Sequence, residues 1–400
     1  MLPALLIFGA TYLALALGRV PGLRIDRTGA AIIGAALMLA AGVLTVPEAY
    51  AAVNYDTVIL LFGMMIVVAN LRLSGVFSLV ASWVVEHAHR PLRLLCGIVL
   101  VSGLFSAFFV NDTICLVLTP LVLEIVRRLR RNPVPYLLAV AMSANVGSVA
   151  TVTGNPQNMM IGSFSGIPYR AFAAALSPVA AVGLLLTVAV IALVYRSEFR
   201  AAGPLRIEHR PVRVHRPLLW KSVFAAAAMI VCFFAGIGAP KVAIVAGALL
   251  LITRRIKPER IYAEIDFGIL VMFVGLFIVI AGIEKTRLPD DLFAFASRYG
   301  LSRTAPMSVF AALLSNLVSN VPAVLVFKSL VPRLPDPARA WLALAMSSTL
   351  AGNLTVLGSV ANLIVIERAR REVRIGFWEY AKAGVPLTLL TLAAGIWLLH

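Results

Sequence analysis

Long apolar runs, separated by short polar or charged breaks, make up most of the chain. A helix that crosses the hydrocarbon core of a bilayer needs about 20 apolar residues, and most of these runs approach or exceed that length. The runs lie at residues 2–17, 29–46, 57–71, 94–126, 134–165, 175–195, 218–235, 240–253, 266–283, 305–332, 338–366 and 378–399. The pattern predicts an all-α polytopic membrane protein. The first run has no basic residues before it, so we interpret it as a span and not as a signal peptide.

The run at 94–126 is too long for one plain helix, and arginines flank it on both sides. The polar sequence Asn111-Asp112-Thr113 interrupts it midway. Because a single crossing would carry an arginine cluster to the outer face, we expect a re-entrant hairpin that enters the membrane and returns. Non-helical backbone at membrane depth is tolerated only where it lines a cavity or is buried in protein. The polar tip therefore marks a candidate site.

Lysine and arginine gather in alternate breaks, among them 72–93, 127–131 and the arginine-rich, proline-punctuated segment 197–217. Basic loops tend to stay on the cytoplasmic side of a membrane. The sides alternate correctly only if the runs at 94–126 and 305–332 are hairpins and not crossings. We therefore predict ten transmembrane helices plus two re-entrant hairpins in the cytoplasmic (inner) membrane, with both termini outside.

The two halves of the chain carry similar motifs in the same order. Residues 106–111 (SAFFVN) resemble residues 315–320 (SNLVSN), and 154–158 (GNPQN) resemble 358–362 (GSVAN). Membrane transporters often contain inverted repeats of this kind. The predicted organisation is a first inverted repeat at 1–200 that includes the N-terminal spans and a hairpin at about 94–126, a cytoplasmic basic linker at 197–217, and a second inverted repeat at 218–400 with a hairpin at about 305–332.

Composition supports a membrane protein and excludes several other classes. Hydrophobic residues make up 61% of the chain and charged residues 13%, against roughly 25% charged in a soluble domain. The net charge of +17 comes from 35 Lys and Arg against 18 Asp and Glu, and it lies in short clusters between apolar runs. This arrangement indicates membrane topology, so we expect no nucleic-acid partner.

No pattern typical of an enzyme or a primary pump is present. The three cysteines stand singly, without zinc spacing, and there is no phosphate-binding loop, serine–histidine dyad or CxxC element. We therefore expect no metal, no cofactor and no enzymatic activity. Cys115 lies two residues beyond the first tip, where its thiol would be able to touch a thiophilic solute such as arsenite; its alternative role is that of a small buried hydrophobe.

The chemistry of the predicted hairpins depends on amides and on one acid. A broken helix presents free N–H groups at one end and free carbonyls at the other, so it can bind an anion or a neutral oxyacid without a permanent protein charge. Asp112 is the only carboxylate in either tip, and Val321 stands at the equivalent position of the second tip. Because burial disfavours the charged form of a carboxylate, Asp112 would exchange a proton during transport, or it caps the helix that follows. Asp56 and Asp266 open equivalent spans and are predicted to cap them.

These motifs resemble the ion-transporter superfamily that contains arsenite permeases (ArsB-like), divalent-anion symporters and NhaD-type antiporters. The motifs that carry the resemblance are Asn111 to Pro120, Gly154 to Asn158, Ser319 to Pro322 and Gly352 to Leu363. The resemblance implies an elevator-type transporter in which the hairpins and broken helices move against a scaffold. It implies that the substrate and ion site contains Asn111, Asp112, Thr113, Gly154, Asn155, Asn158, Ser319, Asn320, Gly358, Ser359 and Asn362.

Departures from the family patterns guide the choice of substrate. Divalent-anion symporters usually carry Ser-Asn-Thr at both tips, and NhaD-type antiporters tend to have Asp where this chain has Ser319. We therefore predict a secondary transporter, as a monomer or homodimer, for a small anion or neutral oxyacid, with arsenite or another inorganic oxyanion favoured. Coupling would be to H⁺ through Asp112. The alternatives are a Na⁺/H⁺ antiporter and a Na⁺-coupled dicarboxylate or sulfate symporter.

Overall fold

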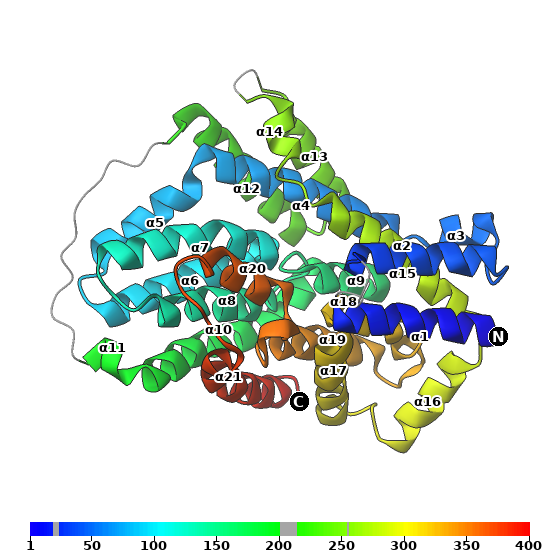
Figure 1. Ribbon diagram of the computed structural model, residues 1–400. Helices are drawn as coiled ribbons and strands as arrows, with labels where there is room; N and C mark the ends of the chain where they lie inside the picture. The colour runs from blue at the N-terminus through cyan, green and yellow to red at the C-terminus, as the bar shows by residue number, and fades with distance from the viewer. Residues whose placement is uncertain (19–23, 201–213, 254–255) are drawn as a thin grey trace.

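The computed structural model describes residues 1–18, 24–200, 214–253 and 256–400, and within these ranges it contains helices and no strands. Many helices, such as α1 (Leu2–Leu17), α2 (Arg27–Ala40) and α7 (Asn111–Arg128), run in roughly the same direction across the view of Figure 1. The prediction of an all-helical fold is confirmed for these ranges. Most of the predicted linker, residues 201–213, lies outside them.

The remaining helices follow the predicted runs closely. Those of the first half are α3 (Val46–Ala52), α4 (Tyr55–Ser74), α5 (Val76–His87), α6 (Pro91–Phe108), α8 (Pro133–Ser148), α9 (Pro156–Ser165), α10 (Tyr169–Val194) and α11 (Arg196–Arg200). Those of the second half are α12 (Arg216–Phe234), α13 (Ala239–Leu251), α14 (Pro258–Tyr262), α15 (Phe267–Glu284), α16 (Leu288–Arg298), α17 (Thr304–Val318), α18 (Asn320–Val326), α19 (Pro337–Ala351), α20 (Val360–Ala369) and α21 (Phe377–Leu398), with short 3₁₀ turns η1 (Val331–Arg333) and η2 (Val356–Gly358).

Six helices of the described residues are long and apolar enough to cross a membrane: α4, α6, α10, α12, α15 and α21. Shorter apolar helices include α1, α2, α13 and α17. A multi-span protein therefore follows from helix length and composition. The number of ten crossings and the outside position of both termini stay predictions.

Each predicted hairpin is a pair of helices that meet at a polar tip. In the first, α6 and α7 are joined through Phe109 and Val110. In the second, α17 and α18 are joined through Ser319. The second hairpin differs from the predicted continuous run at 305–332, because α18 has only 7 residues before turns and η1 replace it. Pro332 lies in η1 and has no N–H to continue an α-helix.

Two predicted spans are broken in the middle. The run at 134–165 consists of α8 and α9, and the run at 338–366 consists of α19 and α20. Most residues of α8 and α19 are buried, which is typical of helices at the centre of a bundle. Both breaks therefore lie deep in the molecule, next to the hairpin tips.

Helices from opposite halves of the chain pack closely in two pairs. A Cβ on Gly63 of α4 would lie 2.5 Å from the backbone of Ala243 in α13, and one on Gly275 of α15 would lie 2.7 Å from the backbone of Ala31 in α2. Only glycine permits helix backbones to approach this closely. The two contacts are equivalent, because Gly275 follows Gly63 by 212 residues and Ala243 follows Ala31 by the same number.

Of the two aspartates that were predicted to cap equivalent spans, one does so and the other does not. Asp266 caps α15, since its Oδ1 accepts from the Ile269 N–H at 3.2 Å. Asp56 does not cap α4: Asn54 does, with its Oδ1 accepting from the Thr57 N–H at 2.8 Å. The prediction for Asp56 is therefore wrong, because an equally good capping residue lies two positions earlier.

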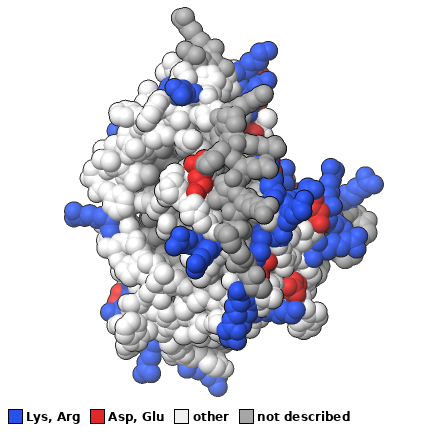
Figure 2. Space-filling model, turned by 90° about the vertical axis from the view of Figure 1, so that its left-hand side faces the viewer, with Lys and Arg blue, Asp and Glu red and all other residues white. Residues whose placement is uncertain are grey.

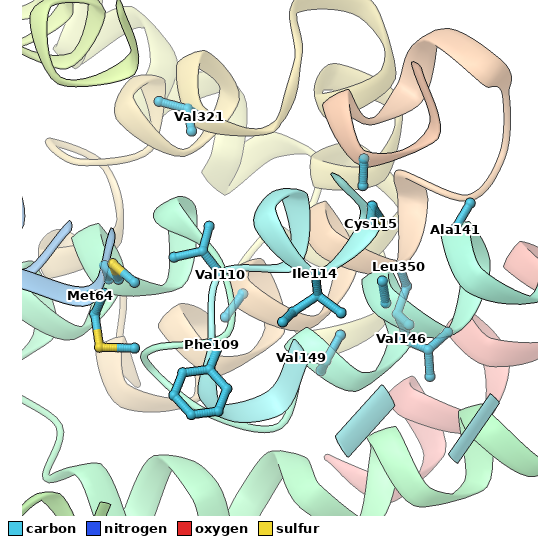
Figure 3. Close-up of a cluster of buried hydrophobic side chains, with 14 of the residues drawn as sticks. Met64, Phe109, Val110, Ile114, Cys115, Ala141, Val146, Val149, Val321 and Leu350 are labelled. Atoms are coloured by element: carbon cyan, nitrogen blue, oxygen red, sulfur yellow. The ribbon is translucent and has the colours of Figure 1, made fainter. Parts of the chain in front are cut away.

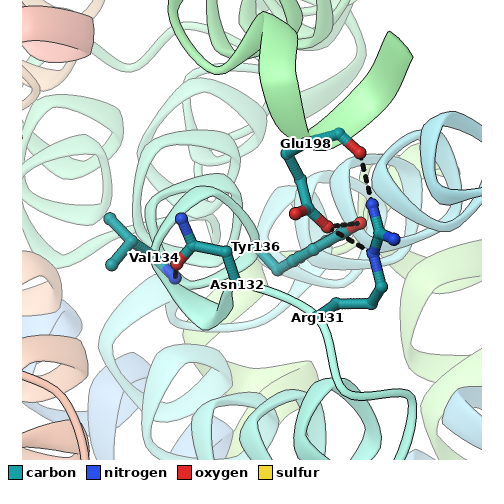
Figure 4. A network of polar contacts seen from close by, with 5 residues as sticks. All are labelled: Arg131, Asn132, Val134, Tyr136 and Glu198. Atoms are coloured by element: carbon teal, nitrogen blue, oxygen red, sulfur yellow. Dashed lines mark hydrogen bonds and ion pairs between the residues drawn. The ribbon is translucent and has the colours of Figure 1, made fainter. Parts of the chain in front are cut away.

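A polar cluster fixes the loop that leaves the first hairpin, as Figure 4 shows. Arg131 Nε pairs with Glu198 Oε1 at 2.7 Å, and the Tyr136 hydroxyl donates to the same oxygen at 3.1 Å. Glu198 belongs to α11, just before the residues that lie outside the described ranges. The start of α8 and the end of the first half are therefore joined by a half-buried ion pair.

Candidate functional site

The tips of both hairpins lie inside the protein. Asn111, the first residue of α7, is 3% exposed, and Asn320, the first residue of α18, is 9% exposed. The backbone N–H of Asn111 donates to the Gly154 carbonyl at 3.0 Å. This bond ties the first tip to the break between α8 and α9.

Asn145, near the end of α8, is the centre of the polar contacts between the two halves. Its Oδ1 accepts from Asn111 Nδ2 at 2.9 Å and from Ser359 Oγ at 3.0 Å. Its Nδ2 donates to Asn353 Oδ1 at 2.9 Å and to Asn362 Oδ1 at 3.0 Å. One buried amide therefore joins the first hairpin tip to the break between α19 and α20.

Side chains of the second break also hold their own loop. Ser359 is the N-cap of α20, and its Oγ accepts from the Ala361 N–H at 3.2 Å. Asn362 Nδ2 donates to the Gly352 carbonyl at 2.7 Å and to the Thr355 carbonyl at 3.0 Å. These bonds satisfy carbonyls that the end of α19 leaves free.

The first break is built in the same way. Asn155 is the N-cap of α9 and accepts from the Asn158 N–H at 2.8 Å. Asn158 Nδ2 donates to the carbonyls of Ser148 at 3.1 Å and Thr151 at 3.0 Å. A Cβ on Gly154 would fall well inside van der Waals contact with the Ser148 carbonyl, so this loop needs glycine there.

Contacts from the first break reach the second half through Thr349 of α19. Its hydroxyl accepts from Asn155 Nδ2 at 3.2 Å and from Gln157 Nε2 at 3.1 Å. In the amide orientation that satisfies both ends of Asn320, its Oδ1 accepts from Gln157 Nε2 at 3.3 Å and its Nδ2 donates to the Gly358 carbonyl at 3.2 Å. The second tip is therefore linked to both breaks.

Asp112 occupies a different position from its neighbour Asn111. It is half-buried, and its carboxyl group faces the backbone N–H of Ala361 at the start of α20. Arg27 and Asp266 are charged groups that act on it. The alternative that Asp112 caps its own helix is wrong, because α7 has Val110 at the N-cap and no side-chain cap bond.

Thr113 and Ser319 complete the predicted set without joining the network. Both are half-buried, and among the described residues neither shows a side-chain hydrogen bond to it. Ser319 has φ 80° and ψ 159°, a conformation that only glycine adopts without strain. The second tip therefore holds a strained backbone next to Asn320.

Apolar side chains pack beneath the first tip, as Figure 3 shows. Phe109, Val110 and Ile114 come from the tip and α7, and they belong to the same buried cluster as Val146 of α8 and Val149, the residue that follows α8. Cys115 is fully buried, and its Sγ lies 4.0 Å from the Val140 carbonyl. Its thiol is therefore packed against α8, in the environment of a small hydrophobe.

Four polar residues of this centre are absent from the site predicted on the sequence, and all are buried: Asn145, Gln157, Thr349 and Asn353. The signal available in the sequence was an amide or hydroxyl near the end of an apolar run, immediately before a broken-helix motif. In the register that aligns Asn158 with Asn362, Asn145 is the counterpart of Thr349. Both residues make side-chain hydrogen bonds that cross between the halves.

The chemistry available here is hydrogen bonding, with one ionisable group. Among the described residues no group of three or more His, Cys, Asp or Glu side chains is placed to hold a metal ion. The buried Oδ1 atoms of Asn111 and Asn158 have no hydrogen-bond donor. A buried acceptor without a donor costs free energy, so these oxygens are suited to a bound hydroxyl group or cation.

Comparison with known proteins identifies the kind of molecule to which this arrangement belongs. A profile of the citrate transporter family (CitMHS) matches residues 5–334. The silicon efflux transporter LSI3 of Oryza sativa subsp. japonica is 31% identical, over 97% of this chain and 95% of that protein. The putative transporter arsB of Dictyostelium discoideum is 24% identical, over 94% of this chain and 87% of that protein.

Among solved structures, the crystal structure of the YdaH transporter of Alcanivorax borkumensis is similar in fold. The TM-score is 0.61 at 15% sequence identity, and the match covers 99% of this chain and 97% of that one. The all-helical, multi-span membrane fold is therefore shared with a transporter.

Proposed function

Because the chain belongs to the citrate transporter family, a family of secondary transporters and not of enzymes, we propose that it transports a small neutral oxyacid or inorganic oxyanion, with arsenite favoured. We place the solute at the hairpin tips and helix breaks, where Asn111 and Asn320 lie. The observation that carries the proposal is the buried network of amides and hydroxyls around Asn145.

The composition of this network favours a neutral, hydroxylated solute over a multiply charged one. Amides can both donate to and accept from hydroxyl groups, and Asn111 Oδ1 is an acceptor that still lacks a donor. No lysine or arginine contributes to the network among the described residues. Arg27 acts on Asp112 but makes none of the network's hydrogen bonds, so the charges of a citrate trianion held beside Asp112 would lack a cationic partner within the network, at a large desolvation cost.

The names of two relatives agree with this choice. Silicon and trivalent arsenic both form weak acids that are neutral, hydroxyl-bearing molecules near pH 7. One relative is a silicon efflux transporter, and another carries the name arsB. A site that binds hydroxyl groups by hydrogen bonds would suit both acids.

Internal symmetry supports the proposed inverted repeat. Asn158 donates to the carbonyls of Ser148 and Thr151, and Asn362 donates to the two carbonyls that follow these by 204 residues. The glycine contacts of α4 with α13 and of α15 with α2 are a second set of equivalent contacts. We propose that the hairpins and broken helices move as one unit against these helix pairs, in an elevator-type cycle.

Asp112 is the proposed coupling group. It stands at the first tip, faces the N-terminus of α20 and has partial access, whereas Val321 takes the equivalent place in the second tip. A carboxyl group at a helix N-terminus is stabilised when charged and must lose that interaction when it takes up a proton. Its protonation would therefore change the contact between α7 and α20 while the solute is bound.

The experiment is a flux assay in proteoliposomes across arsenite, silicic acid, phosphate, sulfate, citrate, dicarboxylates and sodium. We expect flux of the neutral acids without any need for sodium. Asn111→Ala and Asn320→Ala should both weaken transport, whereas Asn132→Ala, which removes only the N-cap of α8 outside the network, should leave solute affinity unchanged.

Flux of citrate or dicarboxylates alone would contradict the neutral-solute proposal. A pH change driven by sodium, without oxyacid flux, would replace it with Na⁺/H⁺ antiport. A loss confined to one of the two tip variants would contradict the symmetric site.

A further inference from the structure

A polar groove lies at the far ends of two helices that begin at the proposed site. It has a volume of about 550 Å³ and is formed between the C-terminal end of α7 and the end of α20 with the turn that follows. Pro120 and Leu123 form its apolar wall. The site at the hairpin tips lies at the opposite, N-terminal ends of the same helices, so this groove is separate from it.

Guanidinium groups dominate the rest of the groove. Arg127, Arg128 and Arg368 line it together with two glutamates, Glu124 and Glu372. Arg127 pairs with Glu372 at 2.8 Å, and Arg128 pairs with Glu124. The two carboxylates are therefore each engaged by one arginine.

Arg368 is the cation that remains. It is exposed, and within the described ranges no hydrogen bond or ion pair satisfies its guanidinium. Figure 2 shows the side of the molecule that lies at the left of Figure 1, where α7 and α20 end, and lysine and arginine outnumber acidic residues there. An anion that enters the groove would therefore meet one unpaired guanidinium beside two that are paired with carboxylates, with one positive charge in excess.

Arginines at helix C-termini have a simpler role, because they complement the partial negative charge of the helix end. That role explains Arg127, Arg128 and Arg368 singly. It does not require that the three converge on one concave space between two helices, next to an apolar wall.

We propose that this groove binds a phosphate group. The planar guanidinium matches phosphate oxygens in a bidentate geometry, and basic pockets between membrane helices suit phospholipid head groups. The phosphate can come from an anionic lipid, whose acyl chains would follow Pro120 and Leu123, or from free phosphate in solution. In either case the ligand would join the ends of α7 and α20.

The test uses two probes, a short-chain phosphatidylglycerol and inorganic phosphate. Calorimetry measures the binding of each probe to the purified protein in detergent. Arg368→Gln should weaken binding by roughly threefold to fivefold, the size of one exposed ionic contact. Arg370→Gln is the matched control, since Arg370 lies two residues away, pairs with Glu367 at 3.5 Å and does not line the groove.

A second pair of variants tests whether removal of a negative charge from the groove tightens phosphate binding. Glu372→Gln frees Arg127 for the ligand and should tighten binding by roughly threefold. Glu367→Gln changes the net charge equally but outside the groove, so it should have no effect.

The outcomes separate the sources of phosphate. Binding of phosphatidylglycerol alone supports a lipid head group, and binding of inorganic phosphate supports a soluble anion. Equal losses in Arg368→Gln and Arg370→Gln, equal effects of the two glutamate variants, or no binding of either probe would each overturn the proposal.

Discussion

Replacement of Asn145 by alanine tests the contact that joins the two halves of the protein. The side chain is buried and makes four hydrogen bonds, to Asn111, Asn353, Ser359 and Asn362. All four partners lie on other segments, so the variant loses bonds between elements and not within one helix. Alanine also leaves a small polar void, which its neighbours cannot fill with apolar atoms.

The size of the effect follows from the number of bonds. Hydrogen bonds between membrane helices contribute about 0.6 kcal/mol each on average, so four bonds correspond to about 2.4 kcal/mol. If this whole amount is lost from solute binding, the affinity falls roughly 50-fold. If it is lost from the fold, the free energy of unfolding falls by a similar amount.

Unfolding by SDS titration in mixed micelles measures the stability, and solute flux in proteoliposomes measures the function. Asn70→Ala is the matched control, because Asn70 is fully buried in α4 but its amide donates only to the Ile66 carbonyl of its own helix, at 2.9 Å. We expect the control to lose about 0.6 kcal/mol or less and to keep transport. Equal stability and equal flux in the two variants would refute the central role of Asn145.

Three further substitutions test local features. Gly154→Ala should impair transport, because its Cβ would overlap the Ser148 carbonyl, whereas Gly9→Ala, with open space around it, should leave flux unchanged. Ser319→Gly should raise the thermal midpoint, since it relieves a conformation that costs about 1–3 kcal/mol; a lower midpoint would contradict the strain. Lys285 and Thr45 lower the pKa of Glu48 to about 2. The ionised Glu48 carboxylate therefore stabilises the fold at pH values above its ordinary pKa of 4.5, and this stabilisation is lost as pH falls toward 2. The deficit in thermal midpoint of Glu48→Gln should therefore shrink over that pH interval, and a constant deficit would contradict the ion pair.

The helices could be predicted from the sequence because a helix that crosses the lipid bilayer needs a run of about 20 apolar residues. The run at 94–126 becomes α6 and α7 at Pro91–Phe108 and Asn111–Arg128, and its interruption lies where the polar tip was expected. The length of an apolar run predicts helix ends less well where polar residues interrupt the run twice, as in the run at 305–332. In the second hairpin α18 ends after 7 residues, because prolines and turns follow it.

The candidate site was predicted only in part. The breaks and tips carry motifs, so Asn155, Asn158, Ser359 and Asn362 could be assigned from sequence, and they lie in one buried network. Asn145 could not, because α8 is buried on all sides and no periodicity distinguishes its functional face. Its role depends on partners more than 200 residues away in sequence.

The orientation of Asp112 also depends on tertiary contacts, which the sequence does not reveal. Sequence placed it in the first turn of α7, where a carboxylate normally caps its own helix. In the structure it faces the start of α20, so it connects the first hairpin to the second break. This cross-contact makes Asp112 a better candidate for coupling than local capping would.

The most direct test of the account is arsenite flux in proteoliposomes with a pH indicator trapped inside, for wild type, Asp112→Asn and the control Asp56→Asn. Asp56 is exposed and takes no part in capping α4. We predict that arsenite movement is accompanied by proton movement in wild type and in Asp56→Asn, and that proton movement is lost in Asp112→Asn while the protein still folds and inserts. Proton movement at the wild-type level in Asp112→Asn would contradict the account.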